Sequence, residues 1–372
     1  MRRRRREYLP WVDVENDEAR RFVKLPIPSF RFIESCAYRS CVDPDHVYAP
    51  VQATDARHGV WRIGIRQPQP EPEQVCMLPD PEHELFGSKL LSDGRLVICS
   101  FQGERLLIVD VHTGALVDQI PLPAAPNDVA YDPADEAILY VCVNSSRYGD
   151  QHALNALRVA SHDLGDIFRV DLRDRSVVRV ASGLEVMAGI AVVGEELWVS
   201  ELYRLVRVDP RTGSWERLSD THDPRFLADN LTHFSGRGGK LILPMYRQAS
   251  WLEVWLSQSN VLSRLAYRLV RNVMPSLAAW LAEPGEVEDV RFGIYDVEAE
   301  SGHLLRLDLN PKKRFGPDRA FPDDNFDGAV THIERADDTL VLINYRSRWV
   351  MMVPVASLPL DDPQPLRAVM CG

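Results

Sequence analysis

A unit of short apolar runs separated by tight turns recurs about every 40 residues along this chain of 372 residues. The clearest copy covers residues 87–110, where Gly87–Leu91, Arg95–Ser100 and Arg105–Asp110 are separated by turns that contain Asp-Gly and Gln-Gly. Such turns between apolar, β-branched runs are typical of β-hairpins. One unit cannot bury both of its faces alone, so several units must close into a ring.

Six copies of this unit can be recognised, at residues 33–65, 87–110, 127–171, 189–209, 229–308 and 329–353. We therefore expect an all-β fold, a six-bladed β-propeller that forms one domain over residues 21–372. Residues 1–20 are expected to be a flexible tail, basic at first and then acidic. The run Arg21–Ile27 is expected to pair into the last blade and close the ring.

Two insertions interrupt the repeat, at residues 144–165 and 248–285. In the second insertion Trp251, Trp255 and several leucines recur at helical spacing, which predicts a helical hairpin inserted in the fifth blade. This hairpin could pack on the face of the propeller. It could also cover a pocket as a lid, or present an apolar patch to a partner or to the surface of a membrane.

Charge and composition exclude some classes of protein. The net charge of −11 argues against a nucleic-acid binder, because neutralising phosphates needs a basic face. The five arginines at the start are not followed by the apolar core of a signal peptide, and no run of 18 apolar residues predicts a membrane-spanning helix. The six cysteines form no C-x-x-C pair. We expect a cytoplasmic protein with reduced thiols.

The innermost strand of each blade in a propeller starts beside the central channel, so residues at these starts should converge. The six candidates are Glu34, Gly87, Asn127, Ala188, Asp229 and Thr331, with Asp128, Asn230, His233 and His332 as neighbours. Carboxylate and amide oxygens gathered in this way suit Ca²⁺ better than Zn²⁺. The alternative is that the Asn-Asp and Asp-Asn pairs satisfy backbone groups where strands begin.

The order of three short motifs resembles a known group of propellers. Ala125–Tyr131 carries an Asn-Asp pair before an apolar strand, Leu227–Leu231 contains Ala-Asp-Asn-Leu, and Val330–Glu334 precedes a last apolar strand. Together they resemble the strictosidine synthase-like and gluconolactonase/paraoxonase six-bladed propellers over residues 30–355. The resemblance implies that Glu34, Asn127 and Asp229 hold a metal ion.

The chain departs from this group at two positions. Ala188 lies where the group has an amide ligand, which would weaken Ca²⁺ binding because Ca²⁺ takes six to eight oxygens. Thr331 aligns with the catalytic glutamate of true strictosidine synthases, so amine condensation of that kind is not implied here.

Two functions follow as hypotheses. The first is a calcium-assisted hydrolase of a small lactone, aryl ester or phosphoester, with His233 or His332 as general base. The second is a metal-free cyclase, lyase or small-molecule-binding scaffold of specialised metabolism, with an apolar or ester-like ligand. In either case the substrate pocket is expected to include Asp128, Asn144, Glu201, Asn230, Thr331, Trp251 and Trp255.

Overall fold

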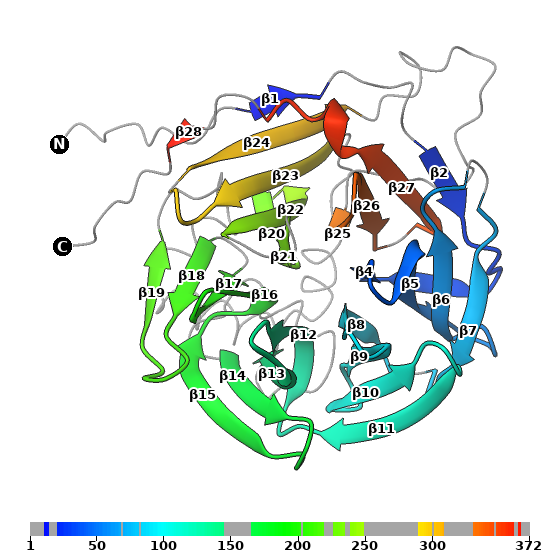
Figure 1. Ribbon diagram of the computed structural model, residues 1–372, viewed down its shortest axis with the longest axis horizontal. Helices are drawn as coiled ribbons and strands as arrows, with labels where there is room; N and C mark the ends of the chain where they lie inside the picture. Colours follow the sequence, from blue (N-terminus) through cyan, green and yellow to red (C-terminus); the bar gives the residue numbers. More distant parts are fainter. Residues whose placement is uncertain are drawn as a thin grey trace, which may run out of the picture.

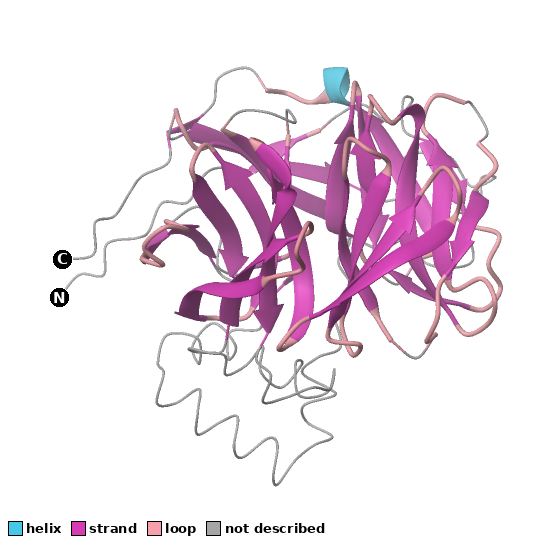
Figure 2. Cartoon of the chain, turned by 60° about the horizontal axis from the view of Figure 1, so that its bottom comes forward, coloured by secondary structure: helices cyan, strands magenta, loops and turns pink. Residues whose placement is uncertain are grey.

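The chain folds into six β-sheets arranged as blades around a central channel (Figure 1). This computed structural model describes residues 11–14, 21–67, 70–81, 83–144, 165–201, 204–218, 226–234, 239–248, 289–299, 301–308, 330–345, 347–360 and 364–365. The expected all-β, six-bladed propeller is therefore confirmed. In an oblique view the strands of the blades run across the thickness of the ring (Figure 2).

The first three blades follow one another along the chain, and each is built from the channel outward. The first contains β3 (Phe30–Ile33), β4 (Ala37–Arg39), β5 (Asp43–Ala53), β6 (Gly59–Gly64) and β7 (Glu73–Met77). The second contains β8 (Leu85–Leu90), β9 (Arg95–Ser100), β10 (Arg105–Asp110) and β11 (Ala115–Pro121). The third contains β12 (Ala125–Asp132), β13 (Asp135–Asn144), β14 (Gly165–Asp171) and β15 (Val177–Leu184).

The last three blades complete the ring. The fourth contains β16 (Met187–Val193), β17 (Glu196–Glu201), β18 (Arg204–Val208) and β19 (Trp215–Leu218). The fifth contains β20 (Phe226–Ala228), β21 (Thr232–His233), β22 (Lys240–Gln248), β23 (Asp289–Asp296) and β24 (Ser301–Asp308). The sixth contains β25 (Val330–Ala336), β26 (Thr339–Asn344) and β27 (Trp349–Pro354), followed by a short 3₁₀ helix, η1 (Val355–Ser357).

The ring is closed by a strand from the N-terminal part of the chain. β2 (Arg21–Lys24) is the outermost strand of the sixth blade and pairs antiparallel with β27, with Phe22 opposite Met351. Val23 is 4% exposed and packs with Val350 in an apolar cluster between blades. The prediction that this run pairs into the last blade is confirmed.

The expectation of a flexible tail over residues 1–20 is wrong for residues 11–14. β1 (Trp11–Asp13) pairs parallel with β24 at the outer edge of the fifth blade. The Arg306 guanidinium donates to the Asp13 carboxylate at 2.6 Å, and Val14 is 2% exposed. The buried Val14, the ion pair between Asp13 and Arg306 and the backbone pairing with the edge of β24 together stabilise this short strand against the fifth blade. β28 (Gln364–Pro365) also pairs with β24.

The core of the protein lies between blades. Alternate side chains of a strand point to opposite faces of its sheet, so each blade buries one apolar face against the blade before it and the other against the blade after it. Val60 of the first blade and Ile98 of the second, both fully buried, belong to one such cluster. Each blade therefore depends on its neighbours, which fixes the geometry of the channel.

Several expectations fall outside the described residues. Residues 249–285, over which most of the helical hairpin with Trp251 and Trp255 was expected, lie outside the described residues. The first residue of the expected range, Gln248, ends β22. Across the described ranges no helix has the length and apolarity needed to span a membrane. Five cysteines lie in the described part and are free thiols, four of them buried.

Candidate functional site: a ring of bulges around the channel

A β-bulge interrupts the inner strand of each blade at the same level of the channel. In β12, Pro126 lies opposite Val143 and Asp128 lies opposite Cys142, so Asn127 is an extra residue without an opposite partner. The same irregularity makes Ala188 the extra residue of β16 and Thr331 that of β25. A bulge redirects the side chain of its extra residue and often lies beside a functional site.

The other three blades have the same extra residue in a less regular form. In the second blade Leu85 pairs with Ser100 and Ser88 pairs with Ile98. Two residues of β8 therefore lie between these pairs, opposite a single residue of β9. In the fifth blade Ala228 pairs with Met245 and Thr232 pairs with Ile242. Residues 229–231 therefore lie opposite only two residues of β22, which leaves one extra residue on the inner side.

The first blade repeats this count between β3 and β4. Ile33 pairs with Val51 and Ala37 pairs with Tyr48, so residues 34–36 lie opposite only two residues of β5 and again include one extra residue. The six positions expected to converge on the channel therefore lie at these bulges.

Asp128 ties three blades together at this level. Its Oδ2 atom accepts a hydrogen bond from the Ile190 amide at 3.0 Å, and its Oδ1 atom accepts one from the Val129 amide at 2.8 Å. A Cβ atom on Gly87 would lie 2.0 Å from Oδ1 of Asp128, so only glycine fits there. Full burial raises the pKa of Asp128, while the positive charge of Lys89 opposes the rise.

Asn230 and Thr331 continue this belt through the fifth, sixth and first blades. The backbone amide of Asn230 donates to the carbonyl of Thr331 at 3.2 Å, and its side-chain amide donates to the carbonyl of Glu34 at 3.3 Å. The Thr331 hydroxyl donates to the same carbonyl at 3.2 Å.

Ser35 closes the belt between the first and second blades. Its hydroxyl donates to the Phe86 carbonyl at 2.8 Å and lies 2.9 Å from the Ser88 hydroxyl. The backbone role that the sequence offered as the alternative is thus present at Asp128 and Asn230.

Three oxygen-bearing side chains next to this belt are the expected metal ligands. Glu34, Asn127 and Asp229 are 6%, 7% and 5% exposed and belong to the first, third and fifth blades. Oδ1 of Asn127 is buried and has no hydrogen-bond partner among the described residues. Two carboxylates and a free amide oxygen are donors that fit Ca²⁺. The bulge of the fourth blade carries only the methyl group of Ala188.

Within the described ranges no three His, Cys, Asp or Glu side chains gather closely enough to hold a metal ion. The expected set has only two residues of these types, because its third member is an asparagine. A site of this composition depends on the amide oxygen and on water for the remaining ligands.

The two histidines proposed as general bases lie at different levels. His332 follows the bulge of β25, is 1% exposed, and has its Nε2 atom 3.4 Å from Oε2 of Glu334. His233, in β21, lines a cavity nearer the other end of the channel. The structure therefore does not bring the two imidazoles to one point.

Glu201 is enclosed by protein donors. It is fully buried, Arg217 binds its two carboxylate oxygens at 2.8 and 3.0 Å, and the amide of Glu185 donates to it at 2.8 Å. Burial raises the pKa of Glu201 in spite of Arg217. Asn144 ends β13 opposite Ala125, and its side chain lies outside the described residues, as do Trp251 and Trp255.

A cavity of about 620 Å³, which was not expected from the sequence, lies in the channel on the far side of the bulges. Its wall includes Arg39, Lys89, Tyr131 and Glu334. One signal was present in the sequence: Lys89 is one of very few lysines in a chain that otherwise uses arginine.

Comparisons with known proteins give no family for this chain. No family model and no curated protein matches the sequence. A solved structure described as a crystal structure of a nidogen/laminin complex contains a chain with 13% identity and a TM-score of 0.43. The match covers 59% of this chain and 73% of that chain, and a likeness of this size carries no implication for function.

Proposed function

We propose that the protein is a calcium-assisted hydrolase of a small lactone, aryl ester or phosphoester, of the strictosidine synthase-like and gluconolactonase/paraoxonase type. The observation that carries the proposal is the buried Oδ1 atom of Asn127, which lacks a partner among the described residues. An unsatisfied buried oxygen is costly unless a ligand compensates for it.

Two buried carboxylates support the same reading. Glu34 and Asp229 flank the belt of contacts at the bulges, as Asn127 does. Carboxylate oxygens are the ligands that Ca²⁺ prefers. A cation held by Glu34, Asn127 and Asp229 would give the Oδ1 atom of Asn127 the partner that it lacks among the described residues.

The chemistry would be divided between the ion and the chain. Bound Ca²⁺ would polarise the carbonyl or phosphoryl oxygen of the substrate. His332 would take a proton from water, and the Glu334 carboxylate, 3.4 Å from Nε2, would stabilise the resulting imidazolium. The belt residues Asp128, Asn230 and Thr331 would keep the bulges in place.

A metal-free binding scaffold, cyclase or lyase is the second candidate. It is favoured by Ala188, which supplies no oxygen, and by Thr331, whose hydroxyl is already bound to the Glu34 carbonyl. In this case the channel would only orient an apolar ligand.

A calcium titration separates the two candidates. If the site binds Ca²⁺, the thermal midpoint should rise with added CaCl₂ by mass action, and Glu34→Gln should abolish most of the rise. Ala188→Asn should enlarge it, while the exposed Glu216→Gln serves as the matched control. Chelation with EGTA should abolish hydrolysis of 4-nitrophenyl acetate or of a lactone. No calcium response in the native protein or in Ala188→Asn would leave the metal-free scaffold.

Compartment and surface partners are separate proposals. We propose a reducing, cytoplasmic location on the basis of the five free thiols. Peripheral membrane contact through residues 248–285 stays a prediction, and vesicle flotation with and without high salt would test it.

A further inference from the structure

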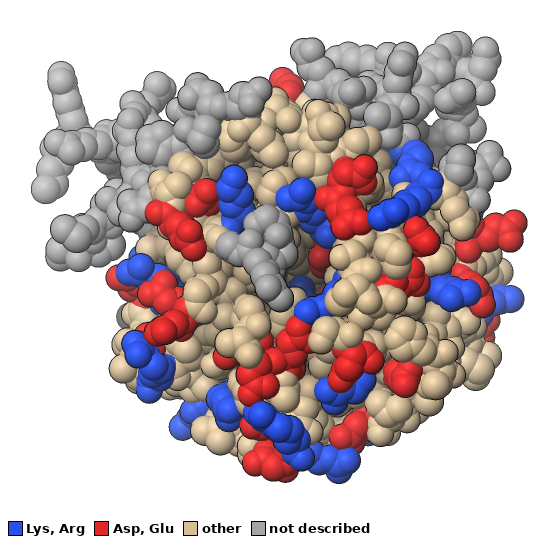
Figure 3. Space-filling model, in the orientation of Figure 1, with Lys and Arg blue, Asp and Glu red and all other residues tan. Residues whose placement is uncertain are grey.

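The cavity on the far side of the bulges is lined by all six inner strands. Each strand contributes residues that follow its bulge, for example Ala37 in the first blade, Lys89 in the second, Ala130 in the third, Ile190 in the fourth and Glu334 in the sixth. The space-filling view shows a hollow at the centre of the ring with basic and acidic side chains around it (Figure 3). A volume of about 620 Å³ lies within the range of small-molecule sites.

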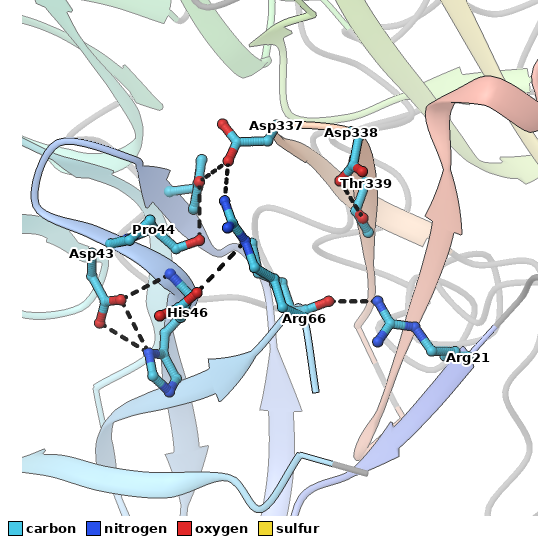
Figure 4. A network of polar contacts seen from close by, with 11 residues as sticks. Arg21, Asp43, Pro44, His46, Arg66, Asp337, Asp338 and Thr339 are labelled. Carbon is cyan, nitrogen blue, oxygen red and sulfur yellow. Dashed lines mark hydrogen bonds and ion pairs between the residues drawn. The ribbon is translucent and has the colours of Figure 1, made fainter. Parts of the chain in front are cut away.

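Most charges on the wall of this cavity already have partners. Arg39 forms an ion pair with Glu136 and lies over the ring of Tyr131. Asp337 accepts hydrogen bonds from Arg66 at 2.8 Å and from Tyr38 at 2.7 Å, in the network of Figure 4.

Arg335 is also engaged, although not with a carboxylate. It donates to the backbone carbonyls of Asp337 and Phe234 at 2.8 and 2.9 Å.

Lys89 differs from these residues. Its Nζ atom is buried and makes no hydrogen bond or ion pair with any described residue. Its charge acts on Asp128, but both oxygens of Asp128 are bound to backbone amides. A buried ammonium without an acceptor is costly, and an anion in the cavity would supply one.

About half of the cavity wall is apolar. Leu90, Ala130, Ile190, Val192 and Leu231 come from four blades and are buried. The Lys89 ammonium, which has no acceptor among the described residues, and these neighbouring apolar residues suit a single negative charge joined to a hydrocarbon group. A phosphate would bring nearly two charges and need more donors than Lys89 provides.

We propose that this cavity binds a small organic carboxylate, with the carboxylate against Lys89 and the hydrocarbon part against the apolar wall. Glu334 lines the same cavity and repels the anion, so it limits the affinity. The site is independent of the proposed metal site, because none of Glu34, Asn127 and Asp229 lines it.

Calorimetric titration of the full chain with sodium hexanoate, in EGTA, tests the proposal. We expect one hexanoate to bind per chain, and hexanamide, which has the same shape without the charge, to bind at least about tenfold more weakly. Lys89→Met should weaken hexanoate binding by a similar factor. The same change at the exposed Lys240 should leave it unaltered.

Glu334→Gln provides a variant with the opposite expected sign. It keeps the shape of the wall and removes the repelling charge, so hexanoate should bind about threefold more tightly or better. This result remains available if Lys89→Met does not fold. Equal binding of hexanoate and hexanamide, equal binding to the native protein and Lys89→Met, or no binding at about 10 mM hexanoate would overturn the proposal.

Discussion

Oδ2 of Asp128 accepts a hydrogen bond from the backbone amide of Ile190, one blade further round the ring, at 3.0 Å. This carboxylate links two blades whose inner strands, β12 and β16, belong to different sheets and do not pair with each other. Asp128 directly follows the bulge at Asn127, and its carboxylate lies against Gly87 of the second blade.

Asp128→Asn should therefore destabilise the protein. The amide keeps one acceptor oxygen but turns an NH₂ group towards a backbone N–H, so one buried hydrogen bond is lost. We expect the free energy of unfolding to fall by about 1–3 kcal/mol. Urea unfolding measures it, and Asp80→Asn, on an exposed turn, is the matched control with little effect. Equal midpoints for the two variants would contradict a tie between blades.

Gly87→Ala tests the close approach of the second and third blades. A Cβ atom at this position would lie 2.0 Å from Oδ1 and 2.7 Å from Cα of Asp128, so the inner strands would have to separate. We expect a loss of about 3 kcal/mol. At Gly194, where φ is +60° and no atom lies within 4 Å of the added Cβ, the same substitution should cost about 1 kcal/mol. Thermal unfolding of both variants gives the comparison, and a smaller loss at Gly87 would show that the strands can part easily.

The strands of the blades could be recognised in the sequence, whereas the side-chain arrangement in the channel could be predicted only in part. Continuous apolar runs such as the one within Arg105–Asp110 mark the strands in the sequence, because both faces of such a strand are buried between blades. A bulge inserts one extra residue and so changes the face to which the following side chains point, and the sequence alone did not show that Thr331 and His332 would take different roles.

Other features depend on contacts distant in the sequence. β1 has only three residues and acquires its stability from β24 almost 300 residues later, so no local pattern marks it. The cavity around Lys89 is formed by six strands, and its shape follows only from the closed ring.

His58 should make the stability of the protein depend on pH. Burial lowers its pKa to about 4, from an ordinary value of about 6.5, and outweighs the hydrogen bond to the Pro79 backbone and the charge of Asp80, which both raise the pKa. Its contribution is complete above pH 6.5. As the pH falls from about 6.5 to about 4, the unfolded chain takes up a proton that the folded chain refuses, so the free energy of unfolding falls by about 2 kcal/mol.

His58→Gln isolates this effect, because glutamine does not titrate. Chemical unfolding at several pH values should show a weaker dependence in the variant between pH 6.5 and 4 than in the native protein. His112→Gln, on an exposed turn, should retain the native dependence. Parallel curves for the native protein and His58→Gln would contradict the assignment.

Arg217→Met should lower the free energy of unfolding, because it leaves the buried carboxylates of the fourth blade with less positive charge beside them. Arg217 binds both oxygens of the fully buried Glu201 and lies 3.7 Å from the Glu185 carboxylate. Removing the guanidinium takes away the described cation closest to Glu201, since Arg204 lies 3.6 Å from the Glu201 carboxylate and 3.5 Å from that of Glu185. We expect a loss of about 3–5 kcal/mol near neutral pH.

The loss in Arg217→Met should shrink on acidification. The pKa of Glu201 is already raised by burial and would rise further in the variant, so the folded chain would take up a proton before the unfolded chain does. Unfolding measured from pH 7 down to pH 5 should show the deficit decreasing.

The double variant Arg217→Met/Glu201→Gln should recover much of the stability at pH 7, and Arg207→Met, in an exposed ion pair with Glu216, should cost less than about 1 kcal/mol. A deficit that is independent of pH and is not reduced in the double variant would mean that Arg217 acts through packing against Trp215, whose ring lies 4.6 Å from its guanidinium, rather than through charge.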